Sequence, residues 1–133
     1  ALSAEDRRAR TQLIDLSLKL EDRSTALREL DLLLSQYDAS GEEEAGLELL
    51  CDLAGSWPGE LELQSRLAQK YVDLGRREEA IRALNALGEL QLDAGRTAEA
   101  AETIGRLAEL EPEKAADYRR LLSQITGNPE RGK

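Results

Sequence analysis

The sequence predicts an all-α fold built from about seven antiparallel helices, and three observations predict it. Leu, Ala, Glu, Arg and Gln, all strong helix formers, dominate the chain. Glycines and prolines separate segments in which apolar residues recur every three or four positions, the period of a helix with one buried face. The chain also matches itself when its numbering is shifted by 54, as repeat proteins do.

The first three expected helices lie at 4–20, 24–39 and 43–55. The first carries a dense apolar run near its end, and the second places Ala26, Leu30 and Leu33 at helical spacing. The third follows Gly41 and begins beside a run of three glutamates, whose carboxylates favour a helix start through the helix dipole.

Four further helices are expected in the rest of the chain, at 60–74, 77–94, 97–110 and 113–126. Pro58 and Pro112 precede the first and the last of them, and a proline is well tolerated where a helix begins. Segment 77–94 has two glutamates in its first turn and ends before Gly95, which suits a left-handed C-terminal cap.

The internal repeat joins these helices into larger units. Aligning 26–73 with 80–127 gives 11 identities in 48 pairs, without a gap. The punctuating residues fall in register, since Gly41 aligns with Gly95 and Pro58 with Pro112. Extended towards the N-terminus, the alignment places Glu21 where a turn glycine is expected. The chain therefore holds two and a half copies, approximately, of a three-helix unit with a period of 54.

These residues resemble the tetratricopeptide repeat (TPR), a helix–turn–helix whose period is 34. Frames 27–60 and 81–114 carry much of the TPR pattern, and 7–40 carries a faint version of it. Frame 61–94 carries it most fully, with Leu67, Ala68, Tyr71, Gly75, Ala80, Leu84 and Leu87.

The frames overlap in two places, because 27–60 begins inside 7–40 and 81–114 begins inside 61–94. The helices at 24–39 and 77–94 are each the second helix of one repeat and the first of the next. Such a helix must make apolar contacts on two sides. The resemblance implies a right-handed α-solenoid, TPR-like with merged helices, in which each added repeat extends one continuous core. We expect one domain over 1–126, followed by a disordered tail or linker at 127–133.

Composition excludes several kinds of function. Without His there is no imidazole base or ligand, and a single Cys builds neither a disulfide nor a cysteine-rich metal site. The formal net charge of −9 disfavours nucleic acid, because binding phosphates requires clustered Lys and Arg. No segment is apolar and long enough to predict a membrane span. We therefore expect no enzyme, no metal or other cofactor, and no nucleic-acid or membrane partner.

The expected function is a protein–protein interaction scaffold that binds a peptide or partner protein, basic rather than acidic, as one module of a larger cytoplasmic protein. The resemblance implies that the first helix of each frame lines a concave groove. Candidate partner-binding residues at solvent-side positions of these helices are Gln12, Asp31, Arg66, Gln69, Arg82, Asn85, Glu89 and Arg120. The alternative is self-association as a homodimer through the unusually apolar helix at 4–20, and binding of a regulatory ligand stays open as well.

Overall fold

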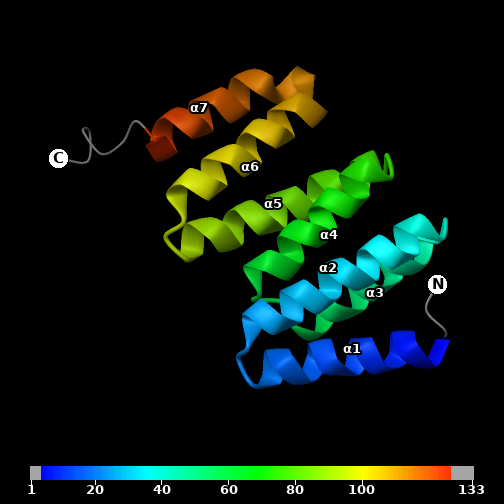
Figure 1. Ribbon diagram of the computed structural model, residues 1–133. Coiled ribbons are helices and arrows are strands. Elements are labelled where there is room, and N and C mark those ends of the chain that lie inside the picture. The colour runs from blue at the N-terminus through cyan, green and yellow to red at the C-terminus, as the bar shows by residue number, and fades with distance from the viewer. Residues whose placement is uncertain (1–3, 127–133) are drawn as a thin grey trace. The chain divides into compact units, whose positions relative to one another are not determined.

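The computed structural model describes residues 4–126 of the chain, and this part of the molecule contains helices and no strand (Figure 1). The all-α prediction is therefore confirmed for the described residues. The helices are α1 (Ala4–Lys19), α2 (Arg23–Ala39), α3 (Glu43–Ser56), α4 (Leu61–Asp73), α5 (Arg77–Asp93), α6 (Thr97–Leu110), the 3₁₀ helix η1 (Pro112–Lys114) and α7 (Ala115–Thr126).

The helix bounds confirm the internal repeat. Adding 54 to the first and last residue numbers of α2 gives the bounds of α5, and the same shift turns the bounds of α3 into those of α6. The predicted bounds differ from the observed ones by at most two positions. The largest difference is at α7, where the turn after Pro112 is 3₁₀ before the α-helix begins at Ala115.

The chain divides into two compact units, residues 1–56 and 57–133. The first contains α1 to α3 and the second α4 to α7, and within each unit successive helices are joined by short turns and run antiparallel (Figure 1). The single domain predicted for 1–126 and the handedness of the solenoid stay predictions. The tail predicted for 127–133 lies outside the described residues.

In unit 1, α2 packs against both α1 and α3. The apolar residues of α2 that the repeat preserves, Ala26, Leu30 and Leu33, are buried. Gly46 of α3 lies close to Leu34 and Tyr37 of α2, so that a small residue permits close approach of the two helices.

In unit 2, α5 packs against α4 and α6, and α7 packs against α6. The core joins Ala68 of α4, Leu84 and Leu87 of α5, and Leu107 of α6. The overlapping frames predict a helix with apolar contacts on two sides, and α5 fulfils this expectation. Among the described residues, no helix has the length and apolar character needed to cross a bilayer.

Candidate functional site

Each unit has a groove beside its first and third helices. The unit 1 groove runs between α1 and α3 and has a cavity volume of about 520 Å³. Its lining is Thr11, Gln12, Asp15, Leu16, Lys19, Leu49, Asp52, Leu53 and Ser56. The unit 2 groove holds about 190 Å³ and is lined by Leu61, Glu62, Ser65, Leu87, Gln91, Glu99, Glu102, Thr103 and Arg106.

The unit 1 groove combines leucines with carboxylates. Leu49 and Leu53 of α3 are buried, whereas Leu16 of α1 has 52% of its surface exposed. Asp15 and Asp52 belong to the two different helices that line this groove. Lys19 Nζ lies 3.2 Å from the carboxylate of Asp15, one helical turn away, and its side chain is 64% exposed.

The unit 2 groove is crossed by polar contacts. Buried Thr103 of α6 donates from Oγ1 to Oε1 of Gln91 on α5 at 2.7 Å. Arg106 of α6 donates from Nη2 to Oε1 of Gln69 on α4 at 2.6 Å. These two bonds tie α6 to α5 and to α4. Ligands that enter here meet polar groups that already have partners.

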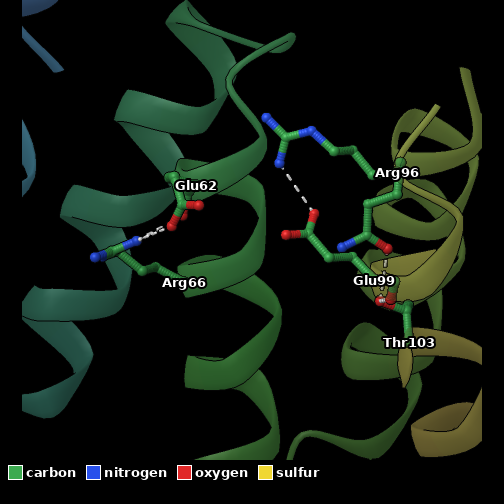
Figure 2. A network of polar contacts seen from close by, with 6 residues as sticks. Glu62, Arg66, Arg96, Glu99 and Thr103 are labelled. Atoms are coloured by element: carbon green, nitrogen blue, oxygen red, sulfur yellow. Dashed lines mark hydrogen bonds and ion pairs between the residues drawn. The ribbon is translucent and has the colours of Figure 1, made fainter. Parts of the chain in front are cut away.

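Figure 2 shows further ion pairs around this groove. Arg66 pairs with Glu62, one turn before it on α4, with 2.8 Å between Nη1 and Oε1. Arg96 pairs with Glu99 at the start of α6 at 3.2 Å. Exposed pairs of this kind contribute little to stability.

The two grooves overlap in part when the repeat is superposed in sequence. Adding 54 to the numbers of the unit 1 residues Thr11, Leu49 and Asp52 gives Ser65, Thr103 and Arg106, which line the unit 2 groove. The two grooves therefore share these three positions, whereas Leu87 and Gln91 of α5 line the unit 2 groove and no residue of α2 lines the unit 1 groove. The side chains make the unit 1 groove larger and more apolar, and the unit 2 groove smaller and more polar.

The predicted partner-binding residues distribute over several faces. Gln12 lines the unit 1 groove, and Gln69 is bonded to Arg106 of the unit 2 groove and to Asp73 of its own helix. Arg66, on the same helix as Gln69, is paired with Glu62. Exposed positions on α2, α5 and α7, outside the two grooves, are taken by Asp31, Arg82, Asn85, Glu89 and Arg120. A role in partner binding stays a prediction for each of these residues.

Sequence reasoning missed the groove residues of α3 and α6, above all Asp52 and Arg106. A signal was present. Since α1 and α3 both pack against α2, and α4 and α6 both pack against α5, the first and third helices of each unit can face a common groove. The groove positions of the third helix follow from this arrangement, but only once its rotation is known.

The clearest pKa shifts lie at junctions that hold the helices. Near the end of α6, Tyr118 donates to Glu111 at 2.5 Å. The pKa of Tyr118 is raised to about 12, first by burial and second by the bond to Glu111. The same bond lowers the pKa of Glu111. In unit 1, Arg7 pairs with Glu42 and lies 4.6 Å from the ring centre of Tyr37. The hydrogen bond to Arg7 lowers the pKa of Glu42.

Comparison with known proteins gives one structural likeness. A thermophilic TPR protein of Thermus thermophilus is 23% identical, over 90% of this chain and 81% of that chain, with a TM-score of 0.34. At that score the likeness assigns neither a family nor a ligand. No family model matches the chain, and no curated protein matches it.

Proposed function

We propose that the chain is a non-catalytic protein–protein interaction scaffold of the TPR kind, which binds a peptide segment of a partner in the unit 1 groove. The observation that carries the proposal is an open groove of about 520 Å³ that an exposed leucine, Leu16, lines together with two buried ones. Its volume lies within the range of roughly 300–1,000 Å³ that ligand pockets occupy.

Leu16 supports this role because its exposure is not required by the fold. An apolar residue on the core side of α1, such as Ile14 or Leu18 nearby, is buried by the packing of unit 1. Leu16 lies instead on the groove side, where an incoming apolar side chain would remove it from water. Burial of such surface is the main favourable term in association.

A peptide selection tests the proposal. A phage-displayed library of random peptides is panned against the immobilised full chain, and enriched peptides are synthesised and measured by calorimetry. We expect binding that Leu16→Gln weakens at least about tenfold, since it removes a central apolar contact. Leu32→Gln is the matched control, because Leu32 is 48% exposed on α2 and does not line the groove. Equal losses in the two variants, or no enriched peptide, would contradict the proposal.

Self-association is the second candidate, and exposed leucines of unit 1 favour it. Leu13 is 40% exposed and Leu20 is 70% exposed, and Leu13 shares a surface hollow with the ion pair of Arg10 and Glu29. Light scattering over a hundredfold range of concentration distinguishes the candidates. A monomer at all concentrations eliminates a homodimer, whereas a dimer that Leu13→Gln dissociates would support one.

The proposal also includes a cytoplasmic location, membership in a larger protein, and independence of cofactors and nucleic acid. The net charge of −9 supports the independence of nucleic acid, because a negative protein repels phosphate backbones. The same charge favours basic partners, most strongly at low salt.

A further inference from the structure

We infer that the unit 1 groove recognises an arginine within an apolar segment of the partner, with the guanidinium bound between Asp15 and Asp52. The inference rests on the proposed function and specifies the chemistry of the peptide. Its basis is the internal repeat, which places a bond from Arg106 to Gln69 beside the unit 2 groove and two aspartates at the equivalent positions in the unit 1 groove.

In unit 2 the protein supplies the guanidinium itself. Arg106 reaches from α6 to Oε1 of Gln69 on α4, a distance of 2.6 Å between heavy atoms, and so links the first and third helices of the unit. The groove beside this link holds about 190 Å³. A hydrogen bond from a charged donor is among the stronger links that two helices can share.

In unit 1 the equivalent pair consists of two carboxylates. Position 69 corresponds to Asp15 and position 106 corresponds to Asp52, and both aspartates line the unit 1 groove. Two ionised carboxylates accept hydrogen bonds and donate none, so that they cannot form the link that Gln69 and Arg106 form. The unit 1 groove, which lacks this link between its helices, has the larger volume of about 520 Å³.

The groove has room for an additional cation beside Asp52. Lys19 is paired with Asp15 of its own helix at 3.2 Å. Among residues 4–126, no cation lies within ion-pair distance of Asp52, which is exposed at the opposite wall. A guanidinium can donate to two carboxylates at once through its planar fork, whereas an ammonium acts as a point charge.

The distribution of charge reinforces this preference. Residues 1–56 contain 6 Lys and Arg against 13 Asp and Glu, while residues 57–133 contain 12 against 14. Unit 1 therefore carries −7 of the net charge of −9. Such an imbalance steers basic segments towards unit 1 and raises their association rate at low ionic strength.

The leucines determine what surrounds the arginine. Leu16, Leu49 and Leu53 lie in the same groove as the two aspartates, so that a bound arginine is flanked by apolar surface. Removal of water by the partner's apolar side chains strengthens a charge pair, because the local dielectric falls. The partner therefore carries apolar residues on both sides of its arginine.

The test uses the panning described above, with peptides compared on the native chain and on Asp52→Asn. We expect the peptides enriched on the native chain to carry an arginine among apolar residues. Replacing that arginine by citrulline, which keeps the shape and removes the charge, should weaken binding at least about tenfold. Asp52→Asn should weaken the arginine peptide similarly and leave the citrulline peptide unchanged. Glu109→Gln, a matched loss of one exposed carboxylate on α6 outside both grooves, should have no effect.

A second variant introduces into unit 1 the hydrogen bond that joins Gln69 and Arg106 in unit 2. The double substitution Asp15→Gln with Asp52→Arg should join α1 to α3 as Gln69 and Arg106 join α4 to α6, and should abolish peptide binding with retention of the helical circular dichroism. Peptides that depend on Leu16 but bind equally in their citrulline and arginine forms would overturn the inference and leave the proposed function intact. A failure to enrich any peptide would eliminate both.

Discussion

Glu21 and Gly75 occupy the same turn position of two successive repeats, and both have a left-handed backbone, with φ of 62° and 72°. Each follows the first helix of its unit, and their neighbours form equivalent hydrogen bonds: Asp22 N donates to Ser17 O at 2.8 Å, and Arg76 N to Tyr71 O at 2.9 Å. The turn is thus built with the same geometry from a glycine and from a residue with a side chain. Glycine adopts positive φ without the steric cost that Glu bears.

We therefore expect Glu21→Gly to stabilise unit 1 by about 1 kcal/mol, because it removes the strain of a left-handed non-glycine residue. Gly75→Glu should destabilise unit 2 by a similar amount, and no atom lies close enough to a Cβ at Gly75 to add a clash. Urea unfolding followed by circular dichroism measures both. Changes of the same sign in the two variants would contradict the interpretation.

The sequence predicts the helices and turns of this protein better than it predicts the groove. The helices follow from local signals, since Gly41, Gly75 and Gly95 have positive φ where the periodic segments end. The repeat then predicts the less obvious turn at Glu21, which no local preference indicates. Local punctuation and self-similarity are sufficient for the elements and their order.

The groove needs more than local signals. Thr11, Gln12 and Asp15 are recognisable as solvent-side positions of a first helix, and all three line the unit 1 groove. The bond between Thr103 and Gln91 joins two helices, and the pairing depends on how far each helix is rotated. That rotation is set by side-chain packing of the whole unit, which neither periodicity nor the internal repeat determines.

Gly88 offers a prediction on helix packing. A Cβ built there would lie 3.6 Å from Cγ2 of Thr103, an ordinary van der Waals contact, although Gly88 is buried. We expect Gly88→Ala to stabilise the protein by about 0.5–1 kcal/mol, since alanine restricts the unfolded chain and favours the helix.

Gly88→Leu should instead destabilise it by about 1–3 kcal/mol, because the larger side chain has to displace Thr103 and separate α5 from α6. Thermal unfolding of the two variants beside the native chain measures the difference. Destabilisation by alanine as well would mean that the helices approach more closely than this spacing indicates.

The bond between Tyr118 and Glu111 predicts how stability depends on pH. The pKa of Tyr118 is raised from 10.0 to about 12, so the folded protein holds this proton more tightly than the unfolded chain. Its contribution is complete below pH 10 and is lost as the pH rises towards 12. In the acid range, the lowered pKa of Glu111 has a corresponding effect, and its contribution to stability is lost as the pH falls through that pKa.

Tyr118→Phe should therefore flatten the alkaline loss of stability and make the acid loss shallower, because the bond from Tyr118 is the main cause of the pKa shift at Glu111. The measurement is urea unfolding at a series of pH values, and the difference between variant and native chain removes the titration of all other groups. Parallel curves across the alkaline range would show that the pKa of Tyr118 is not raised in the folded protein, and parallel curves in the acid range would show that the bond to Glu111 does not persist in solution.

The buried pair of Thr103 and Gln91 gives the last prediction. Thr103→Val keeps the shape of the side chain but leaves Oε1 of Gln91, which is 7% exposed, without its donor. An unpaired buried acceptor costs about 1–3 kcal/mol, so this variant should lose stability of that order. Thr103→Ser keeps the hydroxyl and should lose less.

Adding Gln91→Leu to Thr103→Val should recover most of the loss, since replacing both partners of a buried bond with apolar groups is far less costly than removing one. The recovered pair would also resemble unit 1, where the position equivalent to Thr103 is Leu49 and is buried. A double-mutant cycle in urea measures the coupling between the two positions. Additive losses, with no recovery in the double variant, would mean that the two side chains do not act as a bonded pair and that the polar character of the unit 2 groove has another origin.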